Sequence, residues 1–192
     1  MKTEKRILII DNYDSFTYNL VQAVESIQKQ KIDVYRNDKI TVDQCNQYEY
    51  IIVSPGPGIP EESGETLNII KTYYTQKKIF GVCLGLQTIA VALGGELDNL
   101  NDVYHGIETP MHVIEDCPIY KNIESPFNAG RYHSWVAKKE KLPVELVINC
   151  TDKDGQIMGL HHKQYPVYGV QFHPESIMTP SGNLMLENFL NL

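Results

Sequence analysis

The first half of the chain alternates between apolar runs and amphipathic segments. Four runs have the short, apolar, β-prone character of buried strands: 6–11, 31–38, 48–54 and 78–82. Three segments carry apolar residues at helical spacing: 15–29, 64–76 and 84–95. Asp14 or Ser15 is expected to cap the first helix, and Gly94-Gly95 to close the third. This order of strands and helices predicts a parallel sheet with right-handed crossovers.

The second half changes character. Four short runs are typical of antiparallel strands: 104–115, 130–140, 144–152 and 155–163. Lys153-Asp154-Gly155 predicts a hairpin turn between the last two. The run 166–172 is expected to return to the main sheet, and 181–192 to form a closing helix. We therefore expect one α/β domain over residues 1–192, with a three-layer, open, mostly parallel central sheet flanked by helices and a small antiparallel addition.

Composition narrows the possible partners. The 192 residues carry a net charge of -7 without a basic run, which argues against nucleic acid. No segment is apolar and long enough to span a membrane, and the start of the chain lacks a signal-peptide pattern, so a cytoplasmic protein is expected. The four cysteines form no CxxC pair, which argues against a zinc ribbon or a disulfide scaffold. His161-His162 lacks further ligands nearby, so neither a metal nor a cofactor is expected.

Cys83 lies at the turn between a predicted strand and a predicted helix, in the stretch FGVCLGLQ. Gly81 and Gly85 occupy the small-residue positions of a nucleophile elbow. The positive end of the following helix favours a thiolate, and the N–H of Leu84 is free to donate because first-turn amides lack helical partners. A lone cysteine is more often a small buried hydrophobe. The elbow pattern favours a nucleophile here.

The stretch SPGPG follows another predicted strand. Pro55 and Pro57 have no N–H, so only Gly56 and Gly58 can donate hydrogen bonds from this loop. A stiff loop with two donors suits an oxyanion hole if a thiolate lies nearby. Taken alone, the loop is better explained as a plain proline-glycine turn.

The third stretch, QFHPES, follows the last predicted strand. A residue before proline favours extended backbone, in which His173 and Glu175 would point to the same side. The carboxylate could then fix the tautomer of the imidazole, whose other nitrogen could exchange a proton with a thiol. Alone, these residues fit a strand end followed by a helix cap. Because ligands of open parallel sheets bind outside the carboxyl ends of the strands, a Cys83-His173-Glu175 triad is the better interpretation.

Together these motifs resemble those of class I (triad) glutamine amidotransferases. DNYDSFTYNL, SPGPG, GVCLG.Q, RYHS and QFHPES occur in the family's order over the full length. The opening DNYDSFTYNL is similar to the glutamine-hydrolysing subunits of anthranilate synthase and 4-amino-4-deoxychorismate synthase. The set is specific, although each motif alone is weak.

The resemblance implies a role for each matching residue. Cys83 would attack the side-chain amide of glutamine, His173 would transfer the proton, and Glu175 would orient His173. The oxyanion would be held by the Leu84 N–H and by the loop of Gly56, Pro57 and Gly58. Gln87 would contact the bound glutamine, and the Ser134–Trp135 backbone would hold its amino-acid end. His133 would pack near that pocket, although a core role is nearly as well supported.

The resemblance also implies a partner, because the chain has no P-loop and no second catalytic cluster. Ammonia would pass to a chorismate-binding synthase subunit, with anthranilate favoured over the folate pathway and use by both left open. Leu86 and Trp135 replace the family's usual His and Leu, and Ile107 stands where a lysine is frequent. Leu86 and Ile107 keep open a catalytically silent binding subunit, although the intact Cys83, His173 and Glu175 argue against it. A stand-alone hydrolase of γ-glutamyl compounds is a further alternative.

Two other α/β readings fit less well. Asp11 and Asp14 could belong to the acidic pocket of a phosphoacceptor receiver domain, but Ser54 stands where such a domain needs an Asp. A dinucleotide-binding fold would need a G-x-G-x-x-G after the first strand, and none is present.

Overall fold

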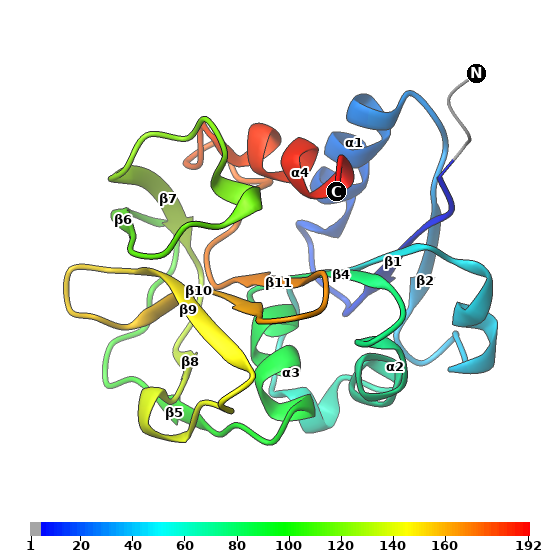
Figure 1. Ribbon diagram of the computed structural model, residues 1–192, viewed down its shortest axis with the longest axis horizontal. Coiled ribbons are helices and arrows are strands. Elements are labelled where there is room, and N and C mark those ends of the chain that lie inside the picture. The colour runs from blue at the N-terminus through cyan, green and yellow to red at the C-terminus, as the bar shows by residue number, and fades with distance from the viewer. Residues whose placement is uncertain (1–4) are drawn as a thin grey trace.

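A computed structural model describes residues 5–192 and contains a nine-stranded sheet in the order β2-β1-β3-β4-β11-β10-β9-β6-β7 (Figure 1). The first five strands in this order run parallel to one another. They are β1 (Ile7–Asp11), β2 (Asp33–Arg36), β3 (Tyr50–Val53), β4 (Lys78–Val82) and β11 (Val167–Val170). The α/β class, the parallel half and the return of the last strand to the main sheet are thereby confirmed.

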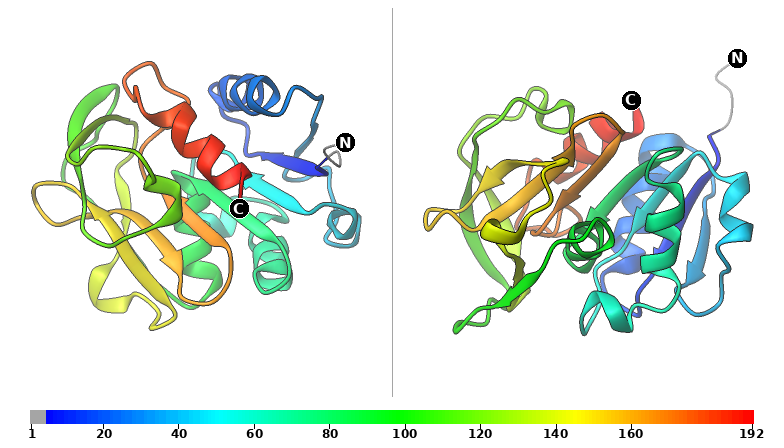
Figure 2. Two further views of the ribbon diagram at one scale, coloured as in Figure 1. Left: turned by 45° about the horizontal axis from the view of Figure 1, so that its top comes forward. Right: turned by 60° about the horizontal axis from the view of Figure 1, so that its bottom comes forward.

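Helices cover both faces of the parallel half (Figures 1 and 2). The four α-helices are α1 (Thr17–Gln28), α2 (Thr66–Tyr73), α3 (Leu84–Ala92) and α4 (Gly182–Leu190). Successive strand residues point to opposite faces, so β1 feeds two cores. Ile7 and Ile9 pack in the core that contains α1 and α4, whereas Leu8 and Ile10 pack in the core that contains α2 and α3. Within residues 5–192, no helix combines the length and the apolar character needed to cross a membrane.

The antiparallel part extends the same sheet. It consists of β10 (Ile157–His162), β9 (Leu146–Thr151), β6 (Ile107–Val113) and β7 (Phe127–Arg131). A separate two-stranded sheet pairs β5 (Leu97–Asn99) with β8 (Trp135–Ala137). Short 3-10 helices occupy Asp43–Gln47, Pro60–Glu62, Pro118–Tyr120 and Lys139–Lys141. The predicted hairpin turn lies between β9 and β10, where Gly155 has a φ of 78°.

Two details of the sequence prediction were wrong. The expected strand 130–140 is divided between β7 and β8, which belong to different sheets, and residues 132–134 cross between them. Their carbonyls bond outside the ladders, for example His133 to the Tyr104 N–H at 3.0 Å and Ser134 to the Leu100 N–H at 2.7 Å. The predicted cap is also displaced, because α1 begins after Phe16, with no side-chain cap. Asp14 Oδ1 instead accepts from the Phe16 N–H at 2.7 Å.

Strand β4 and helix α3 approach each other closely around the turn that joins them. A Cβ added to Gly81 would lie 2.4 Å from the carbonyl carbon of Gly85, and one added to Gly85 would lie 2.7 Å from the Val53 carbonyl oxygen. Only glycine permits this spacing, since the opposing atoms belong to the backbone and cannot rotate away. The two glycines therefore allow a strand to turn directly into a helix at Cys83.

We expect Gly81→Ala to lower the free energy of unfolding by about 3 kcal/mol, because the added methyl group must displace backbone. Urea denaturation would measure the loss. Gly155→Ala is the control: its Cβ would meet nothing within 4 Å, so only the backbone strain of about 1–2 kcal/mol is expected. Equal stability of Gly81→Ala and wild type would contradict the packing argument.

Candidate active site

Cys83 occupies the turn between β4 and α3 with φ 53° and ψ -103°. A positive φ costs an L-residue about 1–2 kcal/mol, so the surrounding structure must impose it. The Cys83 N–H donates to the Val170 carbonyl at 2.8 Å, and the side chain is 5% exposed. Leu84 is the first residue of α3, so its N–H has no acceptor within the helix. The geometry agrees with the nucleophile elbow expected from the sequence.

His173 and Glu175 contact each other, but not through the extended backbone that the sequence suggested. Strand β11 ends at Val170, and the Ser176 N–H bonds to the His173 carbonyl at 3.2 Å, which closes a turn around Pro174. This turn, rather than strand alternation, brings His173 Nδ1 to 2.7 Å from Glu175 Oε1. The two side chains are 2% and 0% exposed.

The surroundings of His173 favour its protonated form. The ring lies against the rings of Phe16 and Tyr132, with centroid distances of 5.6 and 4.8 Å. Burial lowers the pKa of His173, but the Cys83 thiol and the Glu175 carboxylate raise it more, from 6.5 to about 10. Among the described residues, Nε2 has no partner in hydrogen-bond geometry. An imidazolium between a carboxylate and a thiol can therefore exchange a proton at Nε2.

The SPGPG loop is held by hydrogen bonds from Asn12, which belongs to the opening motif of the chain. Asn12 donates to Ser54 twice, from its N–H to Oγ at 2.8 Å and from Nδ2 to the carbonyl at 2.9 Å. Asn12 Oδ1 in turn accepts from Asn37 Nδ2 at 2.9 Å. A Cβ on Gly56 would lie 2.5 Å from Asn12 Cβ, so the loop can rest on this residue only because position 56 is glycine.

The expected substrate residues surround a cavity of 230 Å³. Its lining consists of Gly56, Pro57, Gly58, Cys83, Gln87, Tyr132, His133, Ser134 and Trp135. Leu84 does not line it, but its side chain packs against the Gly56 position beside the cavity. The sequence prediction did not include Tyr132, although this residue lies inside the motif RYHS. It also missed Gln171, whose Nε2 is 3.4 Å from Cys83 Sγ.

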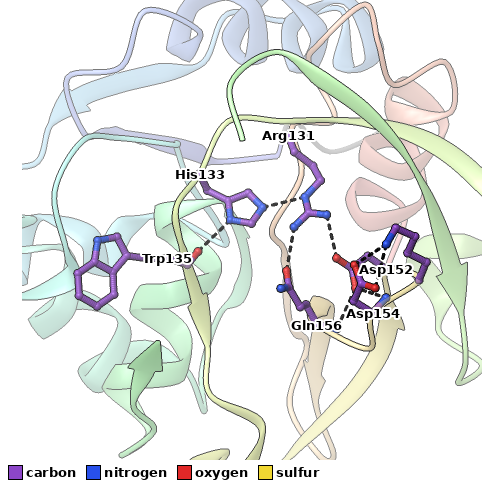
Figure 3. A network of polar contacts seen from close by, with 7 residues as sticks. Arg131, His133, Trp135, Asp152, Asp154 and Gln156 are labelled. Carbon is purple, nitrogen blue, oxygen red and sulfur yellow. Dashed lines mark hydrogen bonds and ion pairs between the residues drawn. The ribbon is translucent and has the colours of Figure 1, made fainter. Parts of the chain in front are cut away.

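A buried charged network holds the cavity wall that comes from the antiparallel half (Figure 3). Arg131 and Asp152 form an ion pair of 2.8 Å between side chains that are 1% and 2% exposed. Arg131 also donates to Gln156 Oε1 at 3.0 Å. Asp152 Oδ1 accepts the main-chain N–H groups of Asp154 and Gln156 at 3.0 and 2.9 Å, so one carboxylate joins the hairpin to Arg131.

The same network sets the protonation of His133. Arg131 Nε can only donate, so His133 Nε2 accepts at 3.1 Å and the ring proton lies on Nδ1. That nitrogen is 3.0 Å from the Trp135 carbonyl and donates to it. Burial and the Arg131 charge lower the pKa of His133 from 6.5 to about 3, so the ring is neutral at physiological pH. Arg131 thus positions the Ser134–Trp135 segment through His133.

The unusual residues of the motifs take different places. Leu86 is fully buried in the core with α2 and packs against the position of Gly169 in β11. Ile107, the first residue of β6, is 45% exposed. Leu86 therefore affects packing inside the fold, whereas Ile107 changes the surface.

Comparison with known proteins agrees with this arrangement. The family model described as glutamine amidotransferase class-I matches residues 8–192. The chain therefore belongs to the class-I glutamine amidotransferase family. Its fold also resembles that of a solved glutamine amidotransferase from Thermotoga maritima, with a TM-score of 0.76 and 15% identity over 90% of this chain and 76% of that one. At this identity the likeness concerns the fold alone.

Three curated relatives cover nearly the whole chain. Anthranilate synthase component 2 of Cyanophora paradoxa is 47% identical, with 96% of this chain and 98% of the relative aligned. The aminodeoxychorismate/anthranilate synthase component 2 of Bacillus subtilis is 42% identical over 96% of this chain and 95% of its own length. The bifunctional protein TrpGD of Thermotoga maritima is 41% identical over 98% of this chain, which spans 32% of that longer protein.

Breaking the buried ion pair should be costly. We expect Asp152→Ala to lower the free energy of unfolding by about 3–5 kcal/mol, because Arg131 remains buried without its counter-ion. The matched control is Asp154→Ala, which removes a pair with Lys153 whose side chains are 77% and 51% exposed. That exposed pair should contribute less than about 1 kcal/mol. Similar losses in urea denaturation of the two variants would refute the argument.

The pKa values of the two histidines should be shifted in opposite directions from the ordinary value of 6.5. Nuclear magnetic resonance of the imidazole nitrogens should find His173 protonated and His133 neutral at pH 8, since their pKa values are about 10 and about 3. Glu175→Gln should lower the pKa of His173, because it removes one of the groups that raise it. His133 should stay neutral at pH 8 in this variant, because burial and the Arg131 charge, the largest causes of its low pKa, remain. A neutral His173 at pH 8 in the wild type would contradict the assignment.

The raised pKa of His173 also makes the stability of the fold depend on pH. Because folding raises the pKa of His173, its contribution to stability is complete below about 6.5 and is lost as pH rises toward about 10.

Proposed function

We propose that this chain is the glutamine-hydrolysing subunit of a chorismate-using synthase, and that it acts through Cys83, His173 and Glu175. The observation that carries the proposal is the buried His173–Glu175 pair beside a cysteine held at a positive φ. An imidazolium beside the sulfur stabilises the negative charge of a thiolate, which is the reactive form of a cysteine nucleophile. The family of the chain and the names of its relatives support the same reaction.

The proposed reaction has two halves. Cys83 Sγ attacks the side-chain carbonyl carbon of L-glutamine, and the tetrahedral oxyanion accepts hydrogen bonds from the N–H of Leu84 and from the glycine loop of Gly56, Pro57 and Gly58. As the carbon–nitrogen bond breaks, His173 gives its proton to the departing nitrogen, which leaves as ammonia. The product is a γ-glutamyl thioester. Neutral His173 then takes a proton from water, which attacks the thioester and releases glutamate and the thiolate.

The cavity supports glutamine as the substrate. Its volume of 230 Å³ suits a single amino acid better than a peptide. Both hydrogen bonds of the Gln87 amide use Nε2, toward the Trp135 carbonyl at 2.9 Å and Gln171 Oε1 at 3.2 Å. Gln87 Oε1 can therefore accept from the substrate, while main-chain groups of Ser134 and Trp135 bind its amino-acid end.

The partner in this proposal is a chorismate-binding component I, which would use the ammonia. We favour anthranilate synthase, since one relative with near-complete mutual coverage carries that name alone. The aminodeoxychorismate synthase of the folate pathway, or service to both, is the second candidate, supported by the dual name of the Bacillus relative. In this role, residues 1–192 would form one amidotransferase domain that acts in the cytoplasm and needs no cofactor.

Cys83→Ser should abolish the glutamine-dependent activity of the complex with its synthase partner and leave the ammonia-dependent activity intact. The serine hydroxyl is a far weaker nucleophile at neutral pH, whereas external ammonia bypasses the glutaminase step. Product formation would be measured with glutamine and with ammonium as alternative nitrogen sources. Full glutamine-dependent activity of Cys83→Ser would disprove the nucleophile assignment.

The same assay separates the alternatives. The chain would be mixed with anthranilate-type and aminodeoxychorismate-type partners in turn. Glutaminase activity that appears with one partner type identifies the pathway. Strong activity of the free chain would favour a stand-alone hydrolase, and binding without activity would favour a silent subunit.

A further inference from the structure

Gln171 is a fully buried polar residue that directly follows β11. Its side-chain Nε2 lies 3.4 Å from Cys83 Sγ, within hydrogen-bond distance for sulfur. Its main-chain N–H donates to the Met158 carbonyl at 2.9 Å, so the backbone is anchored independently of the side chain. A buried polar amide is costly unless it is hydrogen-bonded, so its position against the sulfur of the proposed nucleophile suggests a chemical role.

The direction of the hydrogen bond between Gln171 and Cys83 is fixed by a chain of donors that ends on the backbone. The Trp135 carbonyl can only accept, so Gln87 must present Nε2 to it at 2.9 Å. The same Nε2 donates to Gln171 Oε1 at 3.2 Å. Gln171 must therefore turn its own Nε2 toward Cys83. The reverse orientation would set two amide NH₂ groups against each other and a carbonyl oxygen against the sulfur.

The other end of this donor chain lies in the charged network. His133 Nδ1 donates to the same Trp135 carbonyl at 3.0 Å, and Arg131 holds His133 in the required tautomer. The carbonyl thus receives two hydrogen bonds, which matches its two lone pairs. As a result, the orientation of the Gln171 amide is fixed by groups whose donor and acceptor roles are themselves fixed, and no hydroxyl that could rotate takes part.

We infer that Gln171 is a further catalytic residue of this chain, which donates a hydrogen bond from Nε2 to Cys83 Sγ and so stabilises the thiolate. The inference rests on the proposed function in taking Cys83 as the nucleophile. A hydrogen bond to an ionised sulfur is stronger than one to a thiol, so the contact favours the reactive form. His173 and Gln171 then supply the thiolate with a proton donor and a fixed dipole.

The test is the rate of alkylation of Cys83 by iodoacetamide as a function of pH. Cys45, Cys117 and Cys150 are buried, and burial raises their pKa values to about 11, 11 and 12, so their alkylation should be slow. Cys83→Ser supplies the background. Gln171→Met removes the donor without burying a charge. We expect it to move the midpoint of the alkylation profile up by about one pH unit and to lower the rate at pH 6 about tenfold.

The chain offers a closely matched control. Asn149 is also fully buried, and its Nδ2 lies 3.4 Å from the sulfur of Cys117, away from the proposed site. Asn149→Leu removes an equivalent amide–sulfur contact and should leave the alkylation profile of Cys83 unchanged. Circular dichroism would establish that each variant is folded.

An alkylation profile of folded Gln171→Met that coincides with that of the wild type would overturn the inference. If Gln171→Met does not fold, Gln171→Glu keeps the shape of the side chain and replaces the donor with a carboxylate, so an even larger upward shift is expected. A shifted profile in a chain that never hydrolyses glutamine would support the role of Gln171 and reject the proposed function. Normal glutamine hydrolysis with an unshifted alkylation profile would support the proposed function and reject the role of Gln171.

Discussion

The direct turn from β4 into α3 is the constraint on which the rest of this molecule depends. It holds Cys83 at a φ of 53°, a conformation that an L-residue adopts only at a cost. Gly81 and Gly85 allow strand and helix to approach closely enough, and the hydrogen bond from the Cys83 N–H to Val170 ties the turn to the neighbouring strand. The two cores that bury both faces of the parallel strands offset the local strain.

Both halves of the chain contribute residues to the lining of the cavity. The parallel half contributes Cys83 and the glycine loop, whose position depends on Asn12 in the opening motif. The antiparallel half contributes the wall from Tyr132 to Trp135, in which residues 132–134 cross between two sheets and belong to no strand. A segment without ladder bonds needs another anchor, and Arg131 provides it through His133. The buried ion pair is thus tied to the geometry of the cavity.

Two buried histidines near one cavity differ in charge, one cationic and one neutral, for reasons that the contacts make clear. His173 lies between a carboxylate and a thiol, which raise its pKa against the effect of burial. His133 faces a guanidinium, which acts in the same direction as burial and lowers its pKa. One ring can therefore deliver a proton, while the other serves as a neutral relay that orients a carbonyl. Residue type alone would not distinguish them.

Local patterns in the sequence determined much of this protein. Apolar runs and helical spacing predicted the parallel half, and the glycines around Cys83 predicted the turn that carries it, because these signals arise between near neighbours. Tertiary structure decided what depends on distant residues. The turn at Pro174, rather than an extended strand, joins His173 to Glu175. The pairing of Arg131 with Asp152 and the contact of Gln171 with Cys83 join positions 21 and 88 residues apart. No local pattern specifies such contacts, since only the packed sheet brings those side chains together.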